Sequence, residues 1–243
     1  MGDVAVIVGA GPGLGAALGR RFARAGCAVA LLARNPETLS EAEGGVRRAA
    51  ASAAPPGRVL AQPCDATDAE SVAQAFRRVR DALGAAAVLV YNAGAFTRGG
   101  ILDLDPGAFE AAWRANCLGA LLCAQQVLPD MVRSKRGTIL LSGATASLRG
   151  SALFASLAVG KAGLRALAQS MAREFGPQGI HVAHVVIDGQ IGTERARARY
   201  PSGRPEASFL QPDALAEQYW QLHIQPPTVW TLELDVRPAV EKF

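Results

Sequence analysis

Residues 4–15 read Val4-Ala5-Val6-Ile7-Val8-Gly9-Ala10-Gly11-Pro12-Gly13-Leu14-Gly15, an apolar run of strand length that leads directly into a glycine-rich turn. A segment of helical periodicity follows and extends to Ala25. Glycines in such a turn let the backbone approach a diphosphate, whose charge is stabilised by the N-terminus of the following helix. The stretch therefore predicts a strand-turn-helix unit that binds the phosphates of a nucleotide.

The rest of the chain repeats this alternation of strand-length apolar runs with longer helical segments. Its apolar runs are continuous, as is typical of parallel strands that are buried on both faces. The pattern predicts an α/β fold with a Rossmann-type, doubly wound, seven-stranded parallel sheet. We expect strands over Val4–Gly9, Ala28–Ala33, Val59–Gln62, Ala87–Tyr91, Thr138–Ser142, Val182–Ile187 and Val229–Leu234. We expect helices over Leu14–Ala25, Pro36–Ala53, Ala69–Leu83, Pro106–Val132, Phe154–Phe175 and Asp213–Leu222.

Composition narrows the class of protein. No break in composition divides the 243 residues, so we expect a single domain over residues 1–243. No apolar run approaches the roughly 20 residues of a membrane-spanning helix, and the N-terminus lacks a signal-peptide pattern, which favours a cytoplasmic protein without a membrane partner. The basic residues behind the net charge of +4 are dispersed, so no nucleic-acid partner is expected.

The cysteines and histidines do not predict a metal site. The four cysteines form no CxxC pair, which favours reduced packing residues. His181 and His184 are three positions apart on a predicted strand, so alternation sends them to opposite faces.

The glycine spacing adds a family resemblance. A GxGxxG pattern would need its third glycine at Leu14, whereas a GxxxGxG pattern is met by Gly9, Gly13 and Gly15. That spacing resembles the short-chain dehydrogenase/reductase family, and further family motifs follow in order up to about residue 193. The resemblance implies an NAD(P)-binding domain whose cofactor contacts are Gly9, Gly13, Leu14, Gly15, Arg34, Asp65, Asn92, Ala93, Gly94, Lys161 and Thr193. Thr193 ends the stretch Asp188-Gly189-Gln190-Ile191-Gly192-Thr193, which is similar to a Pro-Gly-x-x-x-Thr motif with aspartate in place of proline.

The end of the second predicted strand indicates which cofactor binds. Family members that prefer NAD have an acidic residue there, and such an acid would repel a 2′-phosphate. This chain has Arg34 and Asn35 instead, and an arginine can pair with a phosphate through two hydrogen bonds. We therefore expect NADP(H) to be favoured over NAD(H).

The catalytic pattern of the family is incomplete. Members use a tyrosine four residues before a lysine, together with a serine thirteen residues before that tyrosine. The lysine corresponds to Lys161, but Leu157 and Ala144 occupy the other two positions, and neither can transfer a proton. Lys161 and Asn116, which resembles the asparagine of the family motif, remain as candidate catalytic residues. Nearby hydroxyl groups without an assigned role are those of Ser142, Thr145, Ser147 and Ser156, and the chain's tyrosines are Tyr91, Tyr200 and Tyr219.

Three functions remain open. In the first, the protein is an NADP(H)-dependent oxidoreductase for a small carbonyl or enone substrate. Its proton would then come from another source, such as a water ordered by Lys161 and Asn116. Alternatively, it binds the nucleotide without turnover as a sensor or pseudoenzyme, or it reuses the pocket for an elimination or isomerisation. The resemblance also implies a homodimer or homotetramer. We expect residues 190–225 to form a substrate lid, whose arginines would either bind an anionic substrate or face solvent.

Overall fold

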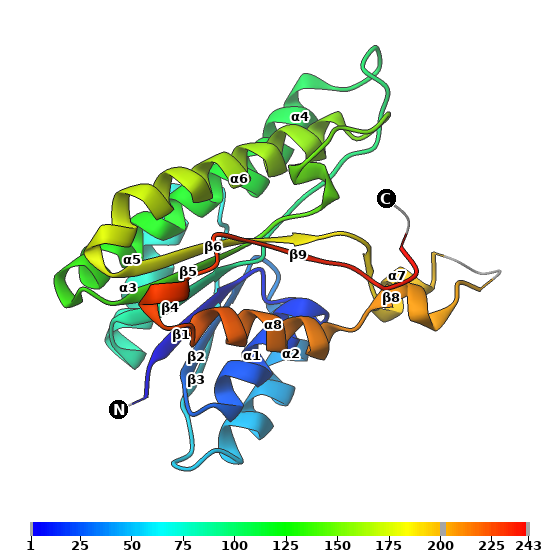
Figure 1. Ribbon diagram of the computed structural model, residues 1–243. Helices are drawn as coiled ribbons and strands as arrows, with labels where there is room; N and C mark the ends of the chain where they lie inside the picture. Colours follow the sequence, from blue (N-terminus) through cyan, green and yellow to red (C-terminus); the bar gives the residue numbers. More distant parts are fainter. Residues whose placement is uncertain (1, 200–202, 242–243) are drawn as a thin grey trace.

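The main sheet has the strand order β3-β2-β1-β4-β5-β6-β9, with every strand parallel to its neighbours (Figure 1). The structure is a computed structural model that describes residues 2–199 and 203–241. The strands of this sheet are β1 (Val4–Val8), β2 (Ala28–Ala33), β3 (Val59–Pro63), β4 (Ala86–Tyr91), β5 (Gly137–Ser142), β6 (Ile180–Ile187) and β9 (Glu233–Val236). The predicted class, a doubly wound α/β fold with a seven-stranded parallel sheet, is confirmed.

Two apolar cores lie on the two faces of this sheet. In β1, Val4, Val6 and Val8 point into one core, whereas Ala5 and Ile7 point into the other. This division explains the continuous apolar runs, since both faces of each central strand must exclude water. The first core is covered by α3 (Ala69–Leu83), α5 (Gly119–Ser134) and α6 (Ala155–Phe175), and the second by α1 (Leu14–Arg24), α2 (Pro36–Ala51) and α8 (Pro212–His223) (Figure 1).

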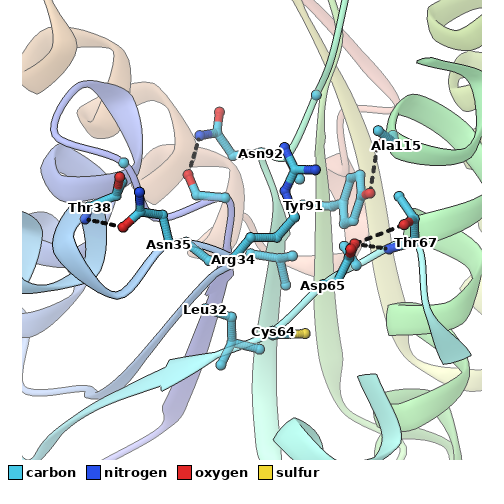
Figure 2. A pocket seen from close by; sticks show the side chains of 17 residues that line it. Leu32, Arg34, Asn35, Thr38, Cys64, Asp65, Thr67, Tyr91, Asn92 and Ala115 are labelled. Carbon is cyan, nitrogen blue, oxygen red and sulfur yellow. Dashed lines mark hydrogen bonds between the residues drawn. The ribbon is translucent and has the colours of Figure 1, made fainter. Parts of the chain in front are cut away.

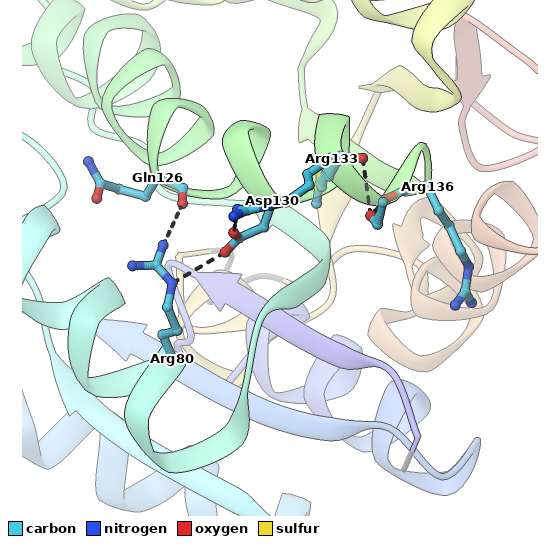
Figure 3. Close-up of polar contacts among 7 residues, drawn as sticks. Arg80, Gln126, Asp130, Arg133 and Arg136 are labelled. Carbon is cyan, nitrogen blue, oxygen red and sulfur yellow. Dashed lines mark hydrogen bonds and ion pairs between the residues drawn. The ribbon is translucent and has the colours of Figure 1, made fainter.

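Polar contacts connect α3 with α5 at the outer surface (Figure 3). Arg80 Nε lies 3.3 Å from Asp130 Oδ2, and Arg80 Nη2 donates to the carbonyl oxygen of Gln126 at 3.2 Å. Arg133 donates to the second carboxylate oxygen of Asp130 from within α5. Exposed ion pairs of this kind contribute about 1 kcal/mol or less. The apolar side chains beneath them therefore hold the two helices on the sheet.

The single long helix predicted over Pro106–Val132 was wrong. The chain forms α4 (Pro106–Trp113), then a π-helical turn over Arg114–Leu118, and only then α5. Tyr91 Oη donates to the carbonyl oxygen of Ala115 at 2.7 Å within this turn, so a strand side chain satisfies a backbone group that the wider turn leaves available. π-Helical turns inside helices are frequent at functional sites, and this one contains Asn116.

The last predicted strand was also wrong in its position. The apolar residues near Val229 belong to a 3-10 turn over Pro227–Val229, and the strand is β9, four residues further along the chain. There Glu233 pairs in register with His184 of β6. Leu234 and Val236 pack against the second core, whereas Glu233 points to the other face and pairs with Arg165 of α6, which explains why the strand alternates polar and apolar residues.

The segment predicted as a lid contains two structurally different parts. Residues 200–202 lie outside the described part of the chain. On either side of them, β7 (Gln190–Ile191) pairs with β8 (Phe209–Leu210), and α7 (Glu194–Arg197) follows β7. In contrast, α8 packs against α1 and contributes buried side chains to the second core, so it belongs to the scaffold.

Within the described residues, no helix is both long and apolar enough to cross a bilayer.

A buried hydroxyl pair connects α8 with the end of β5 and allows a test of the fold. Ser142 Oγ and Tyr219 Oη are 2.7 Å apart, and both side chains are buried. We expect Tyr219→Phe to lower the free energy of unfolding by about 1–3 kcal/mol, because the Ser142 hydroxyl loses its partner. The melting temperature should fall by about 2–4 °C per kcal/mol in differential scanning calorimetry.

The double variant Tyr219→Phe with Ser142→Ala is the control for this prediction. It removes both polar partners, so most of the lost stability should return. A double variant as unstable as the sum of its single variants would show that the two hydroxyl groups do not stabilise each other.

Candidate functional site

A cleft runs along the carboxyl ends of the central strands, where the strand order changes direction between β1 and β4. Ligands of doubly wound sheets bind at this position. The cleft consists of two cavities of about 280 and 400 Å³. Gly9, Gly11 and Asn92 line both, so the two cavities adjoin at the glycine-rich turn.

The turn after β1 depends on close contact between two backbones. Gly9 has φ = +85°, and a Cβ atom there would lie 2.4 Å from the backbone nitrogen of Ala93. Asn92 Nδ2 donates to the carbonyl oxygen of Gly9 at 3.0 Å and fixes the end of β4 against the turn. Gly13 is the N-cap of α1, and no side chain caps that helix. Its first N–H groups therefore face the cleft where an anion would be stabilised.

The smaller cavity lies between the ends of β2, β3 and β4 (Figure 2). Arg34 extends across it between Asn35 and Asp65, and Asn35 caps α2 by accepting hydrogen bonds from Glu37 N and Thr38 N. Burial raises the pKa of Asp65, but hydrogen bonds from Thr67 and the nearby arginines outweigh burial and lower the pKa below its usual value. The cavity thus combines an ionised carboxylate with an exposed guanidinium group.

The larger cavity extends from the glycine-rich turn towards the lid segment. Thr193 lines it and lies against the turn, since a Cβ atom at Gly13 would be 2.6 Å from Thr193 Cγ2. Ala144 and Lys161 line the opposite part of the cavity. Among the described residues that line this cavity, Lys161 is the only one with a titratable side chain.

Lys161 is buried, and its ammonium group donates to the carbonyl oxygen of Ser142 at 2.7 Å. Burial lowers the pKa of Lys161 to about 8, because transfer of the charged form from water is unfavourable. The pKa of the neighbouring His184 is lowered to about 4, mainly by burial and in smaller part by the positive charge of Lys161. Near neutral pH the imidazole is therefore neutral, and Lys161 can both bind and release a proton.

Asn116 lies beside this lysine but lines neither cavity. Its Nδ2 donates to the carbonyl oxygens of Ala95 at 2.5 Å and Ala112 at 2.8 Å. Its Oδ1 is buried and has no hydrogen-bond partner among the described residues. A Cβ atom at Gly94 would lie 3.0 Å from this oxygen and 3.6 Å from Lys161 Nζ, so both atoms face the same glycine. The unpartnered oxygen can accept a hydrogen bond from a water or a ligand at that point.

The candidate hydroxyl groups around Ala144 and Leu157 are engaged elsewhere. Ser142 bonds to Tyr219, and Thr145 donates to Asp188. Ser147 pairs with His184 Nε2 at 3.2 Å and accepts from the backbone N–H of Ala144. Ser156 donates to the carbonyl oxygen of Thr97 at 2.8 Å. Each of these four hydroxyl groups is thus bonded to another residue of the chain, and Leu157 and Ala144 carry no hydroxyl group of their own.

The described tyrosines do not replace the missing one either. The hydroxyl group of Tyr91 already donates to the carbonyl oxygen of Ala115 in the π-helical turn. Burial raises the pKa of Tyr219 far above its usual value. Tyr200 lies outside the described residues.

The cofactor residues expected from the sequence all line one of the two cavities. Gly9, Arg34, Asp65, Asn92, Ala93 and Gly94 line the smaller cavity. Gly9, Gly13, Leu14, Gly15, Asn92, Lys161 and Thr193 line the larger one. Sequence reasoning missed Thr38 and the pair Asp188–Arg237. Asn35 is a typical N-cap residue, and recognising it would have placed Thr38 in the first turn of α2, beside the cavity. Nothing local in the sequence indicates the pair Asp188–Arg237.

The lid arginines are paired mainly within their own segment. Arg197 bonds to Glu206 and to the carbonyl oxygen of Gly192, and its guanidinium lies 5.3 Å from the ring centroid of Phe209. Arg195 and Arg199 are exposed. Arg195 and Arg199 thus agree with the solvent-facing alternative, whereas Arg197 is held by contacts within its own segment.

The fold belongs to the doubly wound α/β class, and its cleft lies at the position where proteins of this class bind their ligands. The sequence model of the family described as short chain dehydrogenase matches residues 3–202. The chain belongs to this short-chain dehydrogenase family.

Relatives agree with this assignment. The chain is 32% identical over 193 residues to the 3-oxoacyl-[acyl-carrier-protein] reductase MabA of Mycobacterium tuberculosis, with 79% of this chain and 71% of MabA covered. A short-chain dehydrogenase structure from Rhodopseudomonas palustris is 34% identical, with a TM-score of 0.80 and 98% of each chain covered. A metagenomic short-chain oxidoreductase in complex with NADP is 28% identical, with a TM-score of 0.81 and the same coverage.

Proposed function

We propose that this protein is an NADP(H)-dependent oxidoreductase that reduces a small carbonyl or enone substrate, with Lys161 as the source of the proton. The observation that supports this most directly is the position of Lys161, the one titratable side chain among the described residues of the larger cavity. The similarity to MabA, which is named as a reductase of 3-oxoacyl groups, favours a carbonyl substrate.

The cleft fits a dinucleotide. The uncapped N-terminus of α1 suits a diphosphate, and Gly9 and Gly13 keep the turn free of side chains. The smaller cavity suits an adenosine with Asp65 at its edge, and Arg34 suits a 2′-phosphate. Lys161 and Asn92 line the larger cavity, where the nicotinamide half would lie.

Residues of the chain can supply what carbonyl reduction requires besides the hydride. When bound, NADPH supplies a hydride to the substrate carbon. The oxygen of the substrate must then gain a proton, which Lys161 Nζ can donate directly or through a water. Asn116 Oδ1 would hold such a water, because this buried oxygen has no other partner. Neutral Lys161 then recovers its proton from solvent.

Nucleotide binding without turnover and a non-redox reaction are the alternatives. Tight NADPH binding without consumption on carbonyl and enone panels would favour a sensor or pseudoenzyme. Product formation at an unchanged NADPH concentration would favour an elimination or isomerisation. The expectation of a homodimer or homotetramer stays a prediction that size-exclusion chromatography with light scattering can test.

Arg34 should determine the preference for NADPH. We expect Arg34→Glu to weaken NADPH binding about tenfold to hundredfold, because the carboxylate removes charge-assisted hydrogen bonds to the 2′-phosphate and repels it. NADH binding should change by less than about threefold, since NADH lacks that phosphate. Isothermal titration calorimetry with each coenzyme measures both effects.

Arg78→Glu is the matched control, because Arg78 is exposed on α3, lines neither cavity and changes the net charge equally. A wild type that binds NADH as tightly as NADPH would contradict the proposed preference. Equal losses for both coenzymes in Arg34→Glu would do so as well.

Lys161 as the proton source predicts a specific pH profile. Ketone reduction at saturating NADPH should be constant below about pH 7 and fall about tenfold per pH unit above pH 8, where the ammonium form is lost. Lys161→Met should lower turnover by about a hundredfold to ten-thousandfold. Lys161→Arg keeps the charge but cannot release a proton, so its turnover should fall about as far as that of Lys161→Met, and the activity that remains should not decline above pH 8.

Restoring the family pattern is the complementary test. Leu157→Tyr with Ala144→Ser adds a phenol one helical turn before Lys161, and ordinary ketones should then be reduced faster than by the wild type. If wild type and Lys161→Met reduce ketones at the same rate, Lys161 is not the proton source.

A further inference from the structure

Asp188 follows β6 directly and is almost completely buried, with 6% of its surface exposed. The corresponding family position resembles a proline, which carries no charge. A buried carboxylate is unfavourable unless other groups pair with it. The contacts of Asp188 therefore require an explanation that the fold alone does not give.

Two other chain segments converge on Asp188. Thr145 Oγ1 donates to Asp188 Oδ1 from the 3-10 turn that follows Ala144. Arg237 Nη1 lies 3.3 Å from Asp188 Oδ2 and comes from the segment after β9. The backbone N–H of Asp188 also donates to the carbonyl oxygen of Val236 at 2.9 Å, a bond that a proline could not make.

The sequence neighbours of this cluster form walls of the larger cavity. Ala144 directly precedes Thr145, Gly189 directly follows Asp188, and both line the cavity. Pro238, which follows Arg237, packs against Gly189 so closely that a Cβ atom there would lie 2.9 Å from Pro238 Cδ. The separation of Ala144 from Gly189 thus depends on the contacts of Asp188.

We propose that Asp188 is a positioning residue for the nicotinamide half of the cofactor site. It holds the turn after Ala144, the end of β6 and the Arg237–Pro238 segment together, and thereby fixes the two walls between which the nicotinamide end and the substrate bind. This role rests on the NADP(H) function proposed above.

The adenine half of the site is independent of this cluster. Arg34, Thr38 and Asp65 line the smaller cavity and belong to segments between β2 and α3. Neither Thr145, Asp188 nor Arg237 lines that cavity. A ligand that occupies only the adenine half should therefore not respond to a change at Asp188.

This independence defines the experiment. Binding of NADPH and of adenosine 2′,5′-bisphosphate, which carries the adenine half alone, is measured by calorimetry for wild type, Asp188→Asn and Asp188→Ala. We expect both variants to weaken NADPH binding by about tenfold or more, because walls displaced by about 1 Å no longer fit the ligand. Binding of the bisphosphate should change by less than about twofold.

Matched variants separate the role of Asp188 from general stability. Asp235→Asn removes the other carboxylate that pairs with Arg237, at 2.7 Å, but Asp235 is exposed and lines neither cavity. It should leave the ratio of the two affinities unchanged. Thr145→Ser keeps the hydroxyl donor and should behave as wild type, whereas Thr145→Val should reproduce the selective loss of NADPH affinity.

The outcomes are distinct. Equal losses for both ligands in Asp188→Ala, or no loss for either, would overturn the positioning role while the proposed function stands. A wild type that binds neither ligand would refute the proposed function and the positioning role together. Selective loss of NADPH affinity in Asp188→Ala and Thr145→Val, with Asp235→Asn unaffected, supports the proposal.

Discussion

The contact between the backbone of Gly9 and the start of the segment after β4 is the constraint on which the site depends. A side chain at Gly9 would collide with the backbone of Ala93, so the two strand ends can meet only because residue 9 has none. Asn92 Nδ2 donates to the carbonyl oxygen of Gly9. These two residues line both cavities, so the cavities adjoin at this contact and form one cleft. The cleft is thus a consequence of how closely β1 and β4 approach at the point where the strand order changes direction.

A second constraint is the burial of Lys161 without a carboxylate partner. Its ammonium group is held by the carbonyl oxygen of Ser142, and burial lowers its pKa. Such an arrangement is unfavourable for stability, and perturbed groups of this kind cluster at functional sites. The π-helical turn that contains Asn116 lies next to Lys161. Such turns interrupt a regular helix and are frequent at functional sites. Two independent departures from a simple scaffold therefore meet beside Gly94.

The sequence predicted features that depend on local patterns and missed those that depend on distant contacts. Continuous apolar runs and the spacing of Gly9, Gly13 and Gly15 are local, which is why the sheet and the glycine-rich turn that lines the cleft could be predicted. The π-helical turn could not, because it is stabilised by Tyr91, 24 positions from Ala115. The apolar residues around Val229 resemble a strand, but pairing with β6 places the strand over Glu233–Val236 instead. Thr145 and Asp188 are 43 positions apart, so no local pattern indicates their bond.

The departures from the family pattern are related to one another. Ala144 and Leu157 carry no hydroxyl group, and the carboxylate of Asp188 accepts a hydrogen bond from the nearby hydroxyl group of Thr145. Ser142 lines the larger cavity, but its hydroxyl group is bonded to Tyr219, and the hydroxyl group of Ser147 is bonded to His184. The polar groups of this region therefore support the walls of the cavity rather than the reacting atoms. Under the proposed function, Lys161 is then the group that donates the proton, since it is the one titratable side chain among the described residues of the larger cavity.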